Sequence, residues 1–360
     1  MAFKHPRFKY YPQHQDYVEM GGGEFRPFVM FTNRESFRSK AVNTDPYGFR
    51  EQYDSNGKFL SLENLRENYS SCNVLIGGSS SFGVDASSDM NTISAHLQKP
   101  GVPCLNFGIR AATSQQELIA FILFKRFLPQ VNNVIIFSGV NHVSMATVEG
   151  TIFYPAFGAV FNEQYKFTTF WKQYMLFEPN KYILAEHRLA LFINRMSERF
   201  KWVRLFMWLL LLWDVKKAVK RKPHIEVAEK LRMMTDYWLN DMHSWQCLQK
   251  QMGFKVHFVI QPIIRWTEKV LTSIEAELFE VDTKLIPSMQ MYANSNIYKS
   301  LREQFAVGCS KNEIDFFDSN EWLNNPMYAS QEIFTDVCHL TDYGNHVIAQ
   351  LLENKLDWKV

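Results

Sequence analysis

The sequence predicts an α/β fold, a three-layer α/β/α sandwich around a central, mostly parallel β-sheet. Short apolar runs at 73–76 (NVLI), 133–137 (NVIIF) and 256–260 (VHFVI) have the length of buried strands. Stretches of helical character separate these runs along the chain. Alternation of strands and helices favours a parallel sheet, because each parallel neighbour needs a crossover that places a helix on one face.

The elements follow one another from about residue 70 onwards. The first strand stops at Gly77-Gly78, and the strand at 133–137 stops at Ser138-Gly139. Ser114 is suited to cap a helix over 114–127. The other expected elements are a helix over 88–97, a strand at 103–107, a helix over 225–252, a strand at 256–260, a weak strand at 315–317 and a final helix over 342–356.

The composition excludes several classes of protein. The 360 residues are 46% hydrophobic with only 16 Gly and 13 Pro, which excludes a mostly disordered or fibrous chain. A net charge of +2 argues against a nucleic-acid binder. The five cysteines are widely spaced without a CxxC pair, so neither a disulfide framework nor a zinc site is expected. The start MAFKHPRFKYYPQHQ has no apolar core, so a secretory signal is not predicted and the cytoplasm is the expected location.

Length alone would allow two or three domains, but the elements point to one enlarged domain. Residues 1–70, rich in aromatics and charges, are expected to be an extension packed on a core of 71–360, and about 145–225 to be a helical insertion. Within it, 196–222 combines Trp and Leu with Lys and Arg. This segment suits a core or dimer-interface helix, a helix on the inner face of an anionic membrane, or a lid over an acyl-chain pocket. The oligomeric state stays open.

Four segments that contain candidate catalytic or binding residues follow predicted strands or precede the last helix. They are 77–83 (GGSSSFG), 106–114 (NFGIRAATS), 138–142 (SGVNH) and 336–345 (DVCHLTDYGN). Sites in parallel sheets form at the carboxyl ends of the strands, so these segments are expected to meet at one edge. A serine in a strand-to-helix loop can expose its hydroxyl, and Asp336 and His339, three residues apart, can form a carboxylate–imidazole pair.

Each segment alone also has an ordinary interpretation. The first could be a simple Gly/Ser loop or a phosphate-binding turn, although no Gly-Lys-Ser/Thr follows as in a P-loop. The last could be a capped helix start with a surface histidine. Together and in this order, the four segments resemble the sequence blocks of the SGNH (GDSL-like) hydrolase superfamily. The resemblance covers about 72–145 and 225–356.

The resemblance extends to individual positions. Gly77-Gly78-Ser79 is similar to the nucleophile block, with Gly78 where many members have Asp, and Gly139-Val140-Asn141 to the Gly-x-Asn block, with His142 where Asp is commoner. Asp336-x-x-His339 is similar to the last block. In the remaining block, the oxyanion-hole glycine aligns with Ala111, while Gly108 lies three residues earlier.

The resemblance implies a serine esterase or related acyl hydrolase without a cofactor or metal. His339 would take the proton of Ser79, Asp336 would orient His339, and the oxyanion would meet the N–H of Ser79, the N–H of Ala111 or Gly108, and the amide of Asn141. The substrate would be an O-acylated sugar, a lipid or a small ester. The alternatives are an O-acyltransferase with the same triad on a glycoconjugate or lipid acceptor, and a non-catalytic binding or scaffold protein.

Four further residues are candidates for the pocket. Gly78 would let a substrate approach the backbone. Arg110 suits either an anionic substrate group or a structural salt bridge. His142 would line the pocket or be a loop residue without a role, and Gln261 would face the site or make a structural hydrogen bond.

Overall fold

The structure is a computed structural model that describes residues 5–21, 23–26, 29–147, 225–286, 289–290 and 294–358. Its centre is a five-stranded sheet in the order β4-β3-β5-β6-β7, in which every neighbouring pair is parallel. The predicted α/β sandwich is therefore confirmed. The strands are β3 (Ser71–Gly77), β4 (Cys104–Gly108), β5 (Gln130–Ser138), β6 (Lys255–Ile260) and β7 (Asp315–Asp318).

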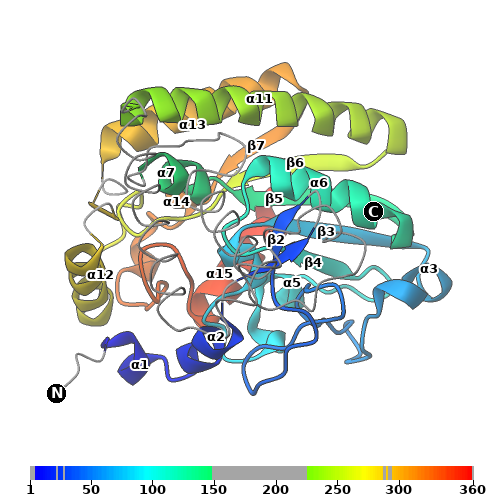
Figure 1. Ribbon diagram of the computed structural model, residues 1–360, viewed down its shortest axis with the longest axis horizontal. Coiled ribbons are helices and arrows are strands. Elements are labelled where there is room, and N and C mark those ends of the chain that lie inside the picture. The colour runs from blue at the N-terminus through cyan, green and yellow to red at the C-terminus, as the bar shows by residue number, and fades with distance from the viewer. Residues whose placement is uncertain are drawn as a thin grey trace, which may run out of the picture.

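Helices cover both faces of this sheet (Figure 1). On one face, α11 (Val227–Met252) packs against α6 (Ser114–Phe124) and α13 (Ser295–Lys311), and on the other α5 (Ile93–His96) packs against α15 (Asp342–Lys355). Trp238 of α11 and Phe305 of α13 have ring centroids 4.3 Å apart, and both pack on Phe258 of β6. Burial of these aromatic rings fixes the helices on the sheet.

The remaining elements surround this layered core. The other α-helices are α1 (Arg7–Tyr10), α2 (His14–Met20), α3 (Leu65–Asn68), α4 (Ser79–Phe82), α7 (Val140–Thr147), α12 (Ser273–Leu285) and α14 (Ser319–Trp322). An antiparallel pair is formed by β1 (Glu24–Arg26) and β2 (Met30–Thr32). The 3-10 turns are η1 (Leu62–Asn64), η2 (Asp89–Asn91), η3 (Lys125–Phe127) and η5 (Pro326–Tyr328).

The observed elements depart from the expected ones in two ways. The helix expected over 88–97 is interrupted, because Thr92 has an extended backbone and caps α5 by accepting a hydrogen bond from Ala95 N–H. The sequence also did not predict α7, α12 and α13. The strands at 73–76, 103–107, 133–137, 256–260 and 315–317 and the helices at 114–127, 225–252 and 342–356 are present with shifted ends.

The segment that precedes β3 shares the hydrophobic core of the sheet. Val29, Phe49, Leu60 and Leu65 are buried in the same cluster as the strand residues. Residues 148–224 lie outside the described part of the chain, so the structure places neither 196–222 nor most of the predicted insertion.

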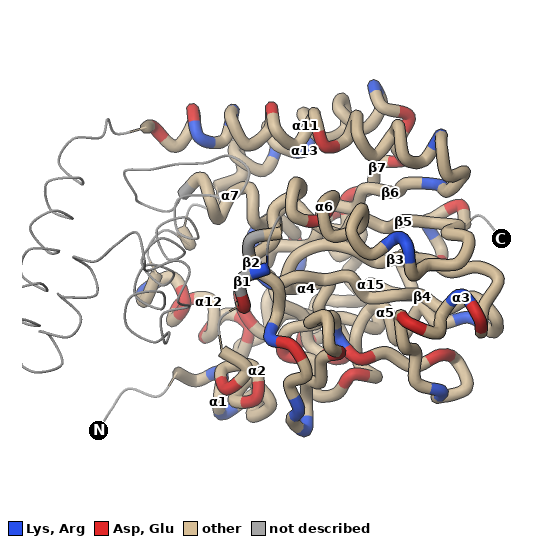
Figure 2. The backbone as a smooth tube through the Cα atoms, turned by 45° about the vertical axis from the view of Figure 1, so that its right-hand side comes forward, with Lys and Arg blue, Asp and Glu red and all other residues tan. Residues whose placement is uncertain are grey.

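The described surface carries charges of both signs. In the view of Figure 2, basic and acidic residues are interspersed along the helices rather than gathered by sign. Among the described helices, none has both the length and the apolar character needed to cross a bilayer.

Candidate active site

Ser79, His339 and Asp336 form a continuous hydrogen-bonded chain. The Oγ atom of Ser79 lies 2.7 Å from Nε2 of His339, and Nδ1 of His339 lies 2.6 Å from Oδ2 of Asp336. A carboxylate that accepts the Nδ1 proton leaves the Nε2 lone pair directed at the hydroxyl. This arrangement is the one expected for a hydroxyl whose proton is to be removed.

The turn that presents Ser79 depends on two glycines. A Cβ atom at Gly77 would lie 2.1 Å from the carbonyl oxygen of Phe137 on β5, and one at Gly78 would lie 2.6 Å from the side-chain nitrogen of Asn141. Any larger residue would push β3 away from its neighbour or Asn141 away from the turn. Ser79 begins the single-turn helix α4, so its N–H has no acceptor within that helix.

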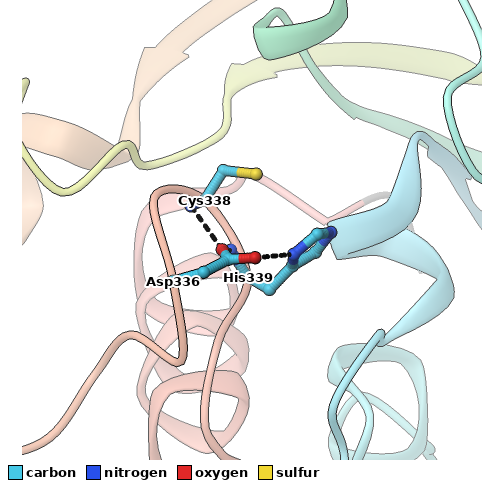
Figure 3. A group of neighbouring side chains, drawn as sticks. All are labelled: Asp336, Cys338 and His339. Atoms are coloured by element: carbon cyan, nitrogen blue, oxygen red, sulfur yellow. Dashed lines mark hydrogen bonds and ion pairs between the residues drawn. The ribbon is translucent and has the colours of Figure 1, made fainter. Parts of the chain in front are cut away.

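Backbone hydrogen bonds in the loop before α15 fix the position of Asp336 relative to His339. The Oδ1 atom of Asp336 accepts hydrogen bonds from the backbone N–H groups of Cys338 (2.8 Å) and His339 (2.7 Å). Figure 3 shows the carboxylate between the Cys338 backbone and the His339 ring. Because one carboxylate oxygen orders the loop, the other is left to orient the imidazole. Thr341 then caps α15 by accepting a hydrogen bond from the N–H of Gly344.

Arg7 of α1 contacts the same carboxylate oxygen of Asp336 as His339 does. Its guanidinium forms an ion pair with Oδ2 of Asp336, and its Nε lies 3.3 Å from Oδ2 of Asp85 and donates to the carbonyl of Thr335. Asp85 is fully buried and also accepts hydrogen bonds from Thr335 Oγ1 (2.7 Å) and from His14 of α2 (2.6 Å). Burial alone would raise the pKa of Asp85, but Arg7 and His14 outweigh it and hold that pKa well below its usual range.

The surroundings keep His339 in its neutral form at neutral pH. Burial, assisted by the positive charge of Arg7, lowers the pKa of His339 to about 4. A neutral imidazole is required of a base that accepts a hydroxyl proton. No sequence pattern marks Arg7, His14 or Asp85, because their positions beside Asp336 arise only from long-range packing.

Three hydrogen-bond donors belong to residues that line the same cavity as the Ser79 side chain. The N–H groups of Ser79 and Ala111 find no acceptor among the described residues, and both residues line the same cavity as His339. The Asn141 amide donates one hydrogen to the Ala112 carbonyl at 2.6 Å and keeps a second. Ala111 has φ +60, a backbone conformation usually taken by glycine.

Gly108, the other donor expected from sequence, lies apart from this cavity. Its N–H donates to Oδ1 of Asn106 at 2.9 Å. A Cβ atom at Gly108 would lie 2.2 Å from the backbone nitrogen of Phe82, so this glycine allows α4 to pack closely on β4.

A cavity of about 340 Å³ opens in front of the triad. Its wall combines the triad with residues from both ends of the chain and from the loops after β4 and β5. The lining residues are Arg7, His14, Tyr17, Val18, Ser79, Val84, Arg110, Ala111, Val140, Asn141, Ser144, Met289, Asp336, Val337, Cys338 and His339.

The remaining sequence candidates are placed differently. Arg110 lines the cavity. Gln261 is fully buried and donates to Ser80 Oγ at 2.9 Å, and Ser80 Oγ in turn donates to the Cys338 carbonyl at 2.8 Å, so Gln261 braces the triad loops from behind. His142 is buried with its ring 5.7 Å from that of Phe305 and does not line the cavity.

Asp336, Cys338 and His339 also lie close enough together to hold a metal ion. Their chemistry does not suit one. Burial raises the pKa of the Cys338 thiol to about 12, so the sulfur stays protonated. The Asp336 carboxylate already meets the cationic Arg7 and the Nδ1 atom of His339.

No family model and no curated protein matches the chain. Among solved structures, it is similar to the acetyl xylan esterase AlAXEase at 13% identity over 79% of this chain and 100% of the other, with a TM-score of 0.36. It is similar to a GDSL-like lipase from Bacteroides thetaiotaomicron VPI-5482 at 16% identity over 79% and 89%, with a TM-score of 0.34. A third similar structure is a variant of the acetyl-xylooligosaccharide esterase Axe2 from Geobacillus, at 12% identity over 82% and 99%, with a TM-score of 0.38. TM-scores of this size assign neither substrate nor residue roles, which rest on the geometry of the site.

Proposed function

We propose that this protein is a serine acyl ester hydrolase of the SGNH (GDSL-like) type. One observation carries the proposal: the contacts of 2.7 Å and 2.6 Å that link Ser79, His339 and Asp336 in the wall of a cavity. The four sequence blocks supply residues to this cavity in the order that the family resemblance implies. The substrate class is an O-acylated sugar, a lipid or a small ester.

The proposed reaction proceeds through an acyl-enzyme. His339 accepts the Ser79 proton while Oγ attacks the ester carbonyl, and the carbonyl electrons move to its oxygen. Collapse of this tetrahedral intermediate breaks the ester bond, and His339 returns the proton to the departing alkoxide. A water molecule then repeats the sequence on the acyl-serine and releases the carboxylic acid.

The negative oxygen of each tetrahedral intermediate needs donors that are already in place. The N–H groups of Ser79 and Ala111 and the second amide hydrogen of Asn141 meet this need without reorganisation. Asp336 contributes by stabilising the imidazolium that forms on His339, and Arg7 limits the freedom of that carboxylate.

Hydrolysis is favoured over transfer to another hydroxyl by the access of water. The His339 side chain remains 17% exposed, so water reaches the base. An acyltransferase would need to exclude water from the acyl-enzyme. Contact of 196–222 with a membrane and residence in the cytoplasm stay predictions.

The test is labelling and turnover with a matched serine control. Ser79→Ala is expected to abolish both the reaction with a fluorophosphonate probe and the hydrolysis of 4-nitrophenyl acetate, while Ser310→Ala, which alters an exposed serine at the end of α13, keeps both. Circular dichroism checks that each variant folds. Labelling of folded Ser79→Ala at the wild-type rate would refute Ser79 as the nucleophile, and sugar or lipid acceptors added to the assay would reveal transfer.

A further inference from the structure

Arg110 is a cation that lines the proposed active-site cavity and has no acidic partner among the described residues. It lies in the loop between β4 and α6, where its backbone N–H donates to Asn33 and its guanidinium donates to the carbonyl of Gly21. Its Nε atom is buried and finds no hydrogen-bond partner in the described part of the chain. Nη2 is therefore anchored on Gly21 and Nε is covered by protein, whereas Nη1 makes no hydrogen bond in the described part of the chain.

In the described part of the chain, the two arginines with the most deeply buried ion pairs contrast with Arg110. Arg7 contacts both Asp85 and Asp336, and Arg50 contacts Asp89 at 2.8 Å. For Arg110, no ion pair with a carboxylate of the described chain exists, and burial lowers its pKa to about 10. The guanidinium therefore stays charged at neutral pH, and an unpaired charge in such surroundings is unfavourable until an anion joins it.

The positive charge of Arg110 acts on the proposed catalytic groups. Arg110 directly precedes Ala111, and both line the same cavity as Ser79 and His339. Its positive charge is one of those that act on the imidazole of His339. An anion held by Arg110 would thus belong to the same bound molecule as an ester carbonyl at Ser79.

We propose that Arg110 is a substrate-binding residue that selects acyl esters carrying an anionic group. The inference rests on the proposed hydrolase function and narrows its substrate class. A guanidinium presents parallel N–H groups that match the two oxygens of a carboxylate or a phosphate. Arg7 cannot take this role because two carboxylates of the chain already occupy it.

The selectivity experiment uses pairs of esters that differ in one anionic group. Mono-4-nitrophenyl glutarate against 4-nitrophenyl butyrate places the charge on the acyl side, and O-acetyl glucuronate against O-acetyl glucose places it on the alcohol side. Wild type is expected to show a higher kcat/KM for the anionic member of at least one pair. Arg110→Gln is expected to reduce that preference about ten- to a hundredfold, the effect of losing a charge-assisted hydrogen bond.

One further variant separates the effect of the paired N–H donors of Arg110 from the effect of its positive charge, and a second serves as a control. Arg110→Lys keeps the charge but not the paired donors and should retain part of the preference. Arg126→Gln removes an exposed arginine outside the cavity and should leave the preference intact. Equal kcat/KM for both members of both pairs in wild type, or an unchanged preference in Arg110→Gln, overturns the proposal.

A binding measurement tests whether Arg110 binds anions, without relying on catalytic turnover. Isothermal titration calorimetry with butyrate, which has no ester bond, and, separately, with inorganic phosphate distinguishes a carboxylate from a phosphate as the preferred anion. Binding of either anion that weakens about ten- to a hundredfold in Arg110→Gln supports the proposal. Binding of neither, or binding that Arg110→Gln leaves unchanged, overturns it. Failure of the hydrolase function would appear instead as esterase activity that Ser79→Ala does not reduce.

Discussion

The guanidinium of Arg7 contacts the carboxylate of Asp336 on the oxygen that also receives the Nδ1 proton of His339. Arg7 is itself held by the fully buried Asp85. A residue from the first helix thus positions the carboxylate of the proposed triad without touching the reacting atoms.

Replacing Arg7 tests this positioning role. Arg7→Gln removes a positive charge that lowers the His339 pKa, so that pKa should rise and the acid limb of the kcat–pH profile should move to higher pH. We expect kcat on the plateau to fall about tenfold, which corresponds to about 1.4 kcal/mol of transition-state stabilisation. Arg7→Lys should restore part of both effects. A profile of Arg7→Gln that superimposes on that of wild type would exclude the role.

The pH dependence of the wild-type enzyme follows from His339. The imidazole must be neutral to accept a proton, and burial together with the charge of Arg7 lowers its pKa from the ordinary 6.5 to about 4. Activity is therefore expected to persist as the pH falls below 6.5 and to be lost only near the lower value. Measurement of kcat/KM for 4-nitrophenyl acetate between pH 3.5 and 8, at constant ionic strength, checks this expectation. An acid limb centred at or above pH 6.5 would contradict it.

Replacing Ala111 tests whether its backbone conformation is strained at the proposed oxyanion site. Its φ of +60 is costly for a residue with a Cβ atom, whereas glycine adopts it freely. Ala111→Gly is expected to raise the free energy of unfolding by about 1 kcal/mol, less the entropy that the added glycine gives the unfolded chain. Urea unfolding followed by fluorescence measures the change. A marked loss of stability would mean that the Ala111 methyl group packs favourably enough to outweigh the strain.

His142 links stability to pH. Burial lowers its pKa from 6.5 to about 4, so between these values the unfolded chain binds the proton more readily than the folded one. The free energy of unfolding is therefore highest above pH 6.5 and decreases as the pH falls toward 4. The contribution of His142 to this decrease is about 2 kcal/mol at pH 5. His142→Phe, whose ring can still pack on Phe305, should remove this part of the loss. Urea unfolding at pH 7 and pH 5 compares the two proteins, and an equal pH dependence would show that His142 does not titrate on unfolding.

The parts predictable from sequence depend on local patterns. β3 and β5 each contain an apolar run, at 74–76 and 134–137, because helices cover both faces of the sheet. The carboxyl ends of these parallel strands meet at one edge of the sheet. Asp336 and His339 lie within one turn of chain, so their pairing needed no knowledge of the fold.

The missed parts depend on distant segments. Arg7 and Asp85 resemble ordinary surface residues in the sequence, and only packing brings them to Asp336. The helices α12 and α13 begin at polar caps, Thr272 and Asn294, and bury only a narrow stripe, which gives a weak apolar periodicity. Whether Gly108 or Ala111 has a free N–H could not be read from spacing, because it depends on the hydrogen bond between Gly108 and Asn106.

The contacts that assemble the triad join segments very far apart in the chain: 260 positions separate Ser79 from His339, and 258 separate Ser80 from Cys338. Closing loops of this length is entropically unfavourable and slow, so such contacts form late. During synthesis, the nascent chain carries its nucleophile long before the base exists to activate it. Enzymatic activity should accordingly be among the last properties regained after dilution from denaturant, later than the far-ultraviolet signal of the helices.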